Sequence, residues 1–449
     1  MLMRKISISI VLSALSVAFA LTSFAQVKVA RLAIKERTLP NGLKVVSLQD
    51  NSSPTVAIHV WYNVGGKNDP QGKSGFAHMF EHMMFKSTKN MPNEKMDRLT
   101  EDVGGFNNAS TWDDFTNYYE VVPSNYLETL IWAEAERMSN LNIDDANFAS
   151  ERDVVKEEFR QGVLAQPYGR LFEYIGSLSY NVHPYKRGVI GDLDQLNAAT
   201  SADAREFHKL YYRPDNAYLI VVGDFDQRQF DAWTDRYFGR VAKPSSTIPR
   251  VTEVEPARTK EVRYEKTAPN VPFPAVAITY LGPKSNDTDL AALRVADKIL
   301  SGGESSRLYQ SLVYKQQIAQ EASFNLDNKV DGGLLYFFAI ASEGKQAAEL
   351  EKSLLAELKL IQDKGVTPKE LAKAKNQLIA DAIRSTETND GKAIAIERSV
   401  AYEGDPKAVN SAVSRLQAVT PADVQRVMKK YFTDTNRVVI YYTNDGGPK

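Results

Sequence analysis

The stretch GFAHMFEHMMFKST, residues 75–88, places two histidines four residues apart with a glutamate between them. The spacing is notable because the chain has only five histidines in 449 residues. On a helix, His78 and His82 lie one turn apart on the same face, where both imidazoles can bind one ion, and Glu81 projects beside them. Catalytic zinc takes three protein ligands and leaves one position open for water. The stretch therefore predicts a helical zinc site that needs a third ligand from elsewhere in the chain.

The order His-Met-Phe-Glu-His reverses the commoner His-Glu-x-x-His and is typical of inverzincins. In both orders the glutamate lies next to a ligating histidine, where it can take a proton from an attacking water without binding the metal. The alternative is that the two histidines are ordinary hydrogen-bonded residues of an apolar helix. A third ligand at a plausible position would decide in favour of the metal.

The candidate third ligand lies in FASERDVVKEEFRQG, residues 148–162, which we expect to be helical. At about 100° per residue, one face of this helix carries four side chains: Glu151, Val154, Val155 and Glu158. A carboxylate on a buried face is costly unless it is paired or bound to a cation. Glu158 is therefore the predicted third ligand, Glu151 is predicted to orient a ligand, and Glu157 is expected to point to solvent. The alternative is that all three glutamates form the solvated face of a charged helix.

Residues 1–25 are predicted to be a signal peptide. A basic start is followed by the apolar stretch Ile6–Leu21 and by the small-x-Ala cleavage sequence Ser23-Phe24-Ala25. An uncleaved membrane anchor is the alternative, but the apolar stretch is short for a bilayer. We therefore expect an exported protein, periplasmic in a bacterium, with no membrane span after signal removal.

The composition describes an ordinary globular protein, with 25% charged residues, 43% apolar residues and a net charge of −1. The balanced charge makes nucleic acid a poor candidate for the partner. Cysteine is absent, which excludes disulfides and thiol catalysis. The chain is longer than one hydrophobic core usually supports, so two domains are expected.

The boundary between the two domains is predicted at VAKPSSTIPRVTEVEP, residues 241–256. This stretch is rich in Pro, Ser and Thr and lacks a helical apolar period, which is typical of a linker. The predicted domains are an N-terminal zinc domain, residues 26–240, and a C-terminal domain without metal, residues 257–449. All histidines lie in the first domain, so chemistry based on histidine belongs there.

The second domain is predicted to repeat the first. The apolar stretch PFPAVAITYLGP, residues 272–283, resembles PTVAIHVWYNV, residues 54–64. TDLAALRVADKILSGG, residues 288–303, then takes the place of the helix that contains His78. This order indicates a duplicated α+β unit of about 200 residues.

Together these motifs resemble the pitrilysin/insulysin family of zinc metallopeptidases, in particular its short form related to the mitochondrial processing peptidase. The resemblance runs from about Thr38 to Phe432. Besides HMFEH at 78–82 and ERDVVKEE at 151–158, it rests on four segments: NASTWDDFTNYY (108–119), HPYKRGVIGDLDQL (183–196), YYRPDNAYLIVVGDF (211–225) and GGESSRLYQSL (302–312).

The resemblance implies an α+β fold of two similar domains, each an antiparallel-rich sheet covered by helices, arranged as a clam shell around a chamber. One Zn²⁺ per chain would be held by His78, His82 and Glu158, with Glu81 as the general base. The implied substrate is an unfolded peptide that adds a strand beside an edge formed by four residues: Asn108, Ala109, Ser110 and Thr111.

The sequence departs from the family in one respect. In many members an Arg and a Tyr of the second half hold the substrate near the zinc, but the strand expected at residues 334–342 has no Arg, and none occurs between Arg307 and Arg384. Arg307 and Tyr309 fit equally well at the start of a capped helix, so we assign them no substrate role. We therefore expect a dimer, or a heterodimer with a related zinc-less subunit that supplies these groups.

The resemblance implies an exported zinc metalloendopeptidase that hydrolyses unfolded peptides. One alternative is a non-catalytic or weakly active subunit of a related peptidase-like complex that binds peptides, such as the respiratory core subunits that resemble this family. Another is a zinc-dependent module that captures unfolded peptides without cutting them. The intact Glu81 argues against both, because a structural metal site gains nothing from a base beside its metal.

Overall fold

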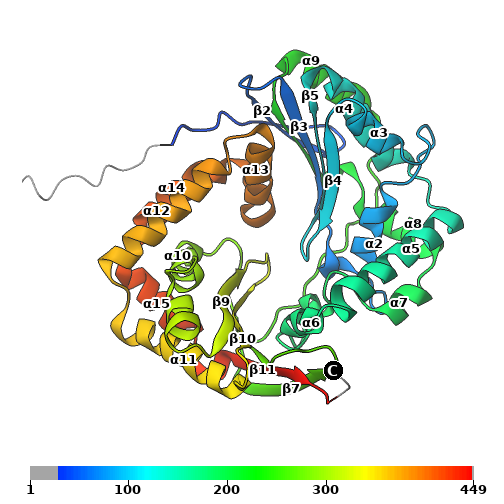
Figure 1. Ribbon diagram of the computed structural model, residues 1–449. Helices are drawn as coiled ribbons and strands as arrows, with labels where there is room; N and C mark the ends of the chain where they lie inside the picture. Colours follow the sequence, from blue (N-terminus) through cyan, green and yellow to red (C-terminus); the bar gives the residue numbers. More distant parts are fainter. Residues whose placement is uncertain (1–28, 447–449) are drawn as a thin grey trace, which may run out of the picture. The chain divides into compact units, whose positions relative to one another are not determined.

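The computed structural model describes residues 29–446, and the predicted signal peptide at residues 1–25 lies outside this range. Residues 32–446 form two mixed sheets and many helices (Figure 1), which confirms the expected α+β class. Within the described range, no helix combines the length and the apolar character that a membrane span requires.

The first sheet has the strand order β1-β2-β6-β3-β5-β4. Its strands are β1 (Lys35–Thr38), β2 (Lys44–Gln49), β3 (Thr55–Tyr62), β4 (Phe106–Thr111), β5 (Thr116–Pro123) and β6 (Ala217–Gly223). All neighbours pair antiparallel except β2 and β6, which are parallel. Strand β4, which carries the predicted substrate segment, is an edge of this sheet.

The second sheet has the order β7-β11-β8-β10-β9. Its strands are β7 (Val262–Ala268), β8 (Ala275–Leu281), β9 (Ala319–Asp327), β10 (Leu334–Ala341) and β11 (Arg437–Asn444). Its single parallel pair is β7 with β11. Strands β7 to β11 thus occupy the positions of β2 to β6 one for one, which confirms the predicted duplication.

Helices cover one face of the first sheet and follow its apolar side chains. They are α2 (Phe76–Met83), α3 (Lys95–Glu101), α4 (Leu127–Asn140), α5 (Asp145–Phe159), α7 (Leu193–Ala198), α8 (Ser201–Tyr211) and α9 (Gln227–Tyr237). Ile58 and Val60 of β3 share a buried cluster with Phe76 and Phe80 of α2 and with Leu130 of α4. This cluster fixes α2 beneath the sheet, and α2 contacts both β4 and α5.

The second sheet is covered in the same way by helices of the second half. They are α10 (Leu290–Ser301), α11 (Ala347–Lys364), α12 (Pro368–Arg384), α14 (Ala412–Ala418) and α15 (Pro421–Tyr431). Helix α10 contacts β9 as α2 contacts β4, so the stretch that lacks histidine occupies the place of the histidine helix, as predicted. Residues 241–256 contain neither helix nor strand, and the domain boundaries at 240 and 257 stay a prediction.

The other face of each sheet is covered by a helix of the opposite half. Ala393 and Ile396 of α13 (Asn389–Glu403) pack against Ile220 of the first sheet. Leu171 of α6 (Gly169–Ser177) packs against Ile440 of the second sheet. Because both faces are covered, β3 and β8 are buried along almost their whole length, which explains their nearly continuous apolar sequences. The sequence did not predict this exchange of helices.

A buried ion cluster fixes α13 on β3. His59 of β3 is fully buried, with Nδ1 at 2.6 Å from Glu397 Oε2 and Nε2 at 3.3 Å from Asp390 Oδ1. Burial lowers the pKa of His59, but its bonds with the two carboxylates outweigh this and raise the pKa to about 9. The imidazole is therefore protonated at neutral pH and links the two halves of the chain.

Candidate metal centre

Helix α2 is anchored at its N-terminus, directly before the histidine pair. Gly75 has φ 88°, and a Cβ there would lie 2.6 Å from the carbonyl oxygen of Ile190, so only glycine fits. The carboxylate of Asp69 accepts hydrogen bonds from the N–H groups of Gly75 (2.7 Å) and Ala77 (2.8 Å). Burial raises the pKa of Asp69 to about 7, although these N–H groups oppose the change. The position of His78, one residue later, is thereby fixed.

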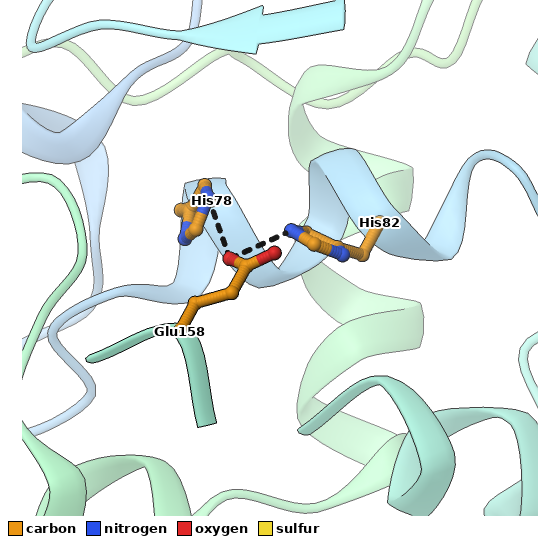
Figure 2. A group of neighbouring side chains, drawn as sticks. All are labelled: His78, His82 and Glu158. Atoms are coloured by element: carbon orange, nitrogen blue, oxygen red, sulfur yellow. Dashed lines mark ion pairs between the residues drawn. The ribbon is translucent and has the colours of Figure 1, made fainter. Parts of the chain in front are cut away.

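The structure brings together the three residues predicted as zinc ligands (Figure 2). His78 Nε2 lies 3.7 Å, and His82 Nε2 lies 3.4 Å, from the same oxygen, Oε2 of Glu158. The carboxylate of Glu158 points from α5 toward both rings of α2. One potential ligand atom from each residue lies within 4.8 Å of the other two. Three donors therefore converge on a single point.

The donor set fits a zinc ion. Two imidazole nitrogens and one carboxylate oxygen are ligands that catalytic zinc sites use, with a further position left for water or substrate. Burial and the neighbouring His82 lower the pKa of His78 to about 4, which keeps this imidazole in the neutral form that binds metals. The opposite nitrogen of this ring, Nδ1, is buried without a hydrogen-bond partner in the described structure.

Glu151 lies on the side of the His82 ring opposite Glu158, and its predicted orienting role stays a prediction. Its Oε2 is 3.7 Å from His82 Nδ1, and its Oε1 is 2.5 Å from Lys86 Nζ. Burial raises the pKa of Glu151, but the interactions with His82 and Lys86 outweigh it and lower the pKa. For His82, burial lowers the pKa, but the surrounding carboxylates outweigh this effect and raise the pKa. The sequence analysis missed Lys86, which lies in the bend after α2, four residues beyond His82.

The predicted helical face of α5 was partly wrong. Val155 and Glu151 are buried, but Val154 is 41% exposed and the side chain of Glu158 is 44% exposed. Helix α5 packs on α2, α7 and α8, so its buried face is centred on Glu151 and Val155, and Glu158 lies at the margin of that face. Glu157 is exposed and accepts hydrogen bonds from neighbouring polar side chains of its own chain segment, as expected.

Glu81 contacts the predicted substrate strand directly. Its Oε2 accepts a hydrogen bond of 2.6 Å from the hydroxyl of Thr111, the last residue of β4. Burial raises the pKa of Glu81, while the Thr111 hydroxyl and His82 act in the opposite direction. The predicted base and the predicted peptide-binding segment therefore belong to one connected site.

The other three predicted substrate residues lie along the same edge strand. The N–H of Ala109 donates to the side-chain oxygen of Asn108 (2.8 Å). The hydroxyl of Ser110 donates to Asn117 Oδ1 (2.5 Å) and accepts from Trp112 Nε1 (3.1 Å). Among residues 29–446, β4 pairs with β5 alone, so the other side of the strand has the unpaired edge that β-strand addition needs.

The turn that follows β4 is fixed by charged side chains from both halves of the chain. Lys329 Nζ lies 2.7 Å from Asp113 Oδ2. Lys67 Nζ lies 2.8 Å from both Asp114 Oδ1 and Asp331 Oδ2. The sequence analysis missed these contacts, because nothing in the local sequence pairs Asp113 with a lysine more than two hundred positions away.

Arg307 forms an ion pair with Glu370 of α12. Its guanidinium donates to both carboxylate oxygens of Glu370, at 2.7 and 2.9 Å, and to the carbonyl of Gly365 at 3.2 Å. Tyr309 begins a short π-helix, Tyr309–Lys315. These contacts agree with assigning neither residue a substrate role.

Comparisons with known proteins agree with this geometry. Residues 44–193 match the family model described as insulinase, peptidase family M16, and residues 198–378 match the one described as peptidase M16 inactive domain. The zinc protease PqqE of Helicobacter pylori is 32% identical over 410 residues, which cover 90% of this chain and 91% of that protein. The chain belongs to peptidase family M16. Membership in this family, also called the insulinase family, confirms the resemblance found in the sequence.

Other members of family M16 support the same fold. The crystal structure of a protease from Helicobacter pylori superposes with a TM-score of 0.88 and 30% identity, covering 92% of this chain and 99% of that one. A probable mitochondrial-processing peptidase subunit beta of Arabidopsis thaliana is 24% identical over 406 residues, which cover 88% of this chain and 76% of that protein. The M16 fold therefore extends over nearly the whole described chain.

Proposed function

We propose that this protein is an exported zinc metalloendopeptidase that hydrolyses unfolded peptides. The observation that carries the proposal is the convergence of His78, His82 and Glu158 beside a glutamate that is hydrogen-bonded to an edge strand. The name of the Helicobacter pylori relative, a zinc protease, supports the same reaction class.

The two histidines and Glu158 would hold one Zn²⁺, with Glu151 keeping the ring of His82 in orientation through Nδ1. Zinc, when bound, polarises a peptide carbonyl and makes a water molecule more acidic. Glu81 takes the proton of the attacking water on its carboxylate and then gives it to the leaving amine. Its raised pKa suits both steps, because the group must bind and release a proton in one cycle.

The free edge of β4 would bind the substrate as an added strand. Main-chain groups of residues 108–111 would pair with an extended peptide, which leaves most substrate side chains unspecified. A folded protein has few free extended segments, so the site selects unfolded peptides. The contact between Thr111 and Glu81 sets the position of the base relative to such a strand.

Export follows from the predicted signal peptide, residues 1–25, and in a bacterium the destination would be the periplasm. A dimer is the proposed active form, because the second half of this chain offers no evident Arg for the substrate. One relative is named as a subunit beta. This name supports a heterodimer of this chain with a related zinc-less subunit.

A non-catalytic or weakly active peptide-binding subunit is the second candidate. The engagement of Arg307 with Glu370 favours it, because this guanidinium is not available to hold a substrate. The complete set of ligands and the presence of Glu81 favour the peptidase.

The two candidates are separated by incubating the mature chain, residues 26–449, with a mixed peptide library and reading the products by mass spectrometry. We expect internal cleavage that is lost on chelation and restored by Zn²⁺, and that is absent from Glu81→Gln prepared in parallel. Binding of peptides without any cleavage, alone and with a co-purifying partner, would favour the second candidate.

A further inference from the structure

The carboxylate of Glu81 is held by one side chain. The hydroxyl of Thr111 donates to Oε2 over 2.6 Å, and within residues 29–446 no other side chain donates a hydrogen bond to this group. Glu81 lies on α2, next to His82 in the sequence, whereas Thr111 is the last residue of β4. The contact thus joins the histidine helix to the edge strand.

We infer that Thr111 is a positioning residue: its hydroxyl fixes Glu81 for proton transfer and couples this carboxylate to the peptide bound along β4. The inference rests on the proposed function and deepens it. It concerns the side chain of Thr111, whereas the substrate-binding role of residues 108–111 concerns their main chain.

The chemistry of the contact suits this role. A glutamate side chain has several rotatable bonds, and proton transfer requires its oxygen within hydrogen-bonding reach of the water. The Thr111 hydroxyl occupies Oε2 and leaves Oε1 for the water.

Thr111 is itself rigidly placed. Its β-branched side chain has few rotamers available, and it pairs in register with Thr116 of β5. The hydroxyl of Thr116 donates to the carbonyl of Val64 over 2.9 Å and lies 3.4 Å from that of Thr111. Two neighbouring strands and the preceding loop therefore determine where the donor to Glu81 lies.

Coupling to substrate follows from the position of Thr111 in β4. A peptide that adds to the free edge pairs with the main chain of the same strand whose side chain holds the base. Ordering of β4 by the peptide therefore also orders the Thr111 hydroxyl and, through it, Glu81. The base is best placed when a substrate strand is bound.

The test compares Thr111→Val, which removes the hydroxyl at nearly constant shape, with Thr111→Ser, which keeps it. Thr55→Val in β3 is the matched control, because the hydroxyl of Thr55 contacts Ser53 and not the metal site. Each variant is assayed for kcat and KM on the best-cleaved peptide of the library and for bound zinc by metal analysis.

We expect kcat of Thr111→Val to fall about 10- to 150-fold, the loss that corresponds to one hydrogen bond to a charged group, with KM and zinc content nearly unchanged. Thr111→Ser should recover most of the rate, and Thr55→Val should match the wild type. In the Glu81→Gln background, Thr111→Val should cause no further loss, because the two residues act as one unit.

The outcomes distinguish this inference from the proposed function. A wild-type protein that cleaves no peptide contradicts the proposed function itself. An active wild type with an equally active Thr111→Val contradicts only the inference. Loss of zinc from Thr111→Val, or no recovery in Thr111→Ser, would show that the residue supports the fold and does not position the base.

Discussion

Because His59 is protonated in the folded protein, the folding stability of the first half should decrease at alkaline pH. Its pKa is raised from 6.5 to about 9 by two carboxylates of α13 that outweigh the effect of burial. The stabilisation is fully present below about pH 6.5 and is lost as the pH rises through about 9, because the unfolded chain releases this proton first. Each pKa unit corresponds to about 1.4 kcal/mol, so the full contribution is about 3 kcal/mol.

The assay is urea unfolding of the wild type and of His59→Gln, which keeps polar contacts but does not titrate. All four tryptophans lie between residues 61 and 233, so their fluorescence reports on the first half. The free energy of unfolding should be higher for the wild type than for the variant at pH 6, and this difference should fall by about 3 kcal/mol between pH 6 and pH 10. The same pH dependence in both proteins would refute the assigned ion cluster of His59, Glu397 and Asp390.

The remaining predictions concern zinc binding and assembly. Glu158→Gln should lose bound zinc because a charged ligand is replaced by a neutral amide. Glu157→Gln should keep both zinc and activity, because Glu157 is exposed and accepts hydrogen bonds from Arg160 and Gln161. Metal analysis of the two purified proteins checks this, and the reverse result would mean that the ligand was assigned to the wrong glutamate. The active form should be a dimer in size-exclusion chromatography with light scattering, and a monomer that is fully active alone would contradict this prediction.

The convergence of His78, His82 and Glu158 could be predicted because each residue lies in a motif whose signal is local. His78 and His82 are one helical turn apart, and the helical period alone places Glu158 and Glu157 in different directions. The period could not tell that Val154 is exposed, because the width of the buried face depends on which helices pack on α5. A helical count gives directions around an axis, and tertiary contacts decide how far burial extends around it.

The fold could be predicted in outline because apolar stretches recur in the same order. The exchange of α6 and α13 between the two sheets could not, since an amphipathic helix shows which face is buried but not which sheet covers it. The contact of Thr111 with Glu81 and the pairing of Lys329 with Asp113 were hidden for a similar reason. Unlike His78, His82 and Glu158, these partners belong to no motif whose spacing points to the contact.

The central claim is that Glu81 acts as the base of a zinc peptidase whose metal is held by His78, His82 and Glu158. Peptide hydrolysis and zinc content of Glu81→Gln, measured side by side with the wild type, test it most directly. We predict that zinc content stays at the wild-type level while hydrolysis falls by about 10²- to 10⁴-fold, the usual effect of losing a positioned general base. Hydrolysis by Glu81→Gln at the wild-type rate would contradict the claim.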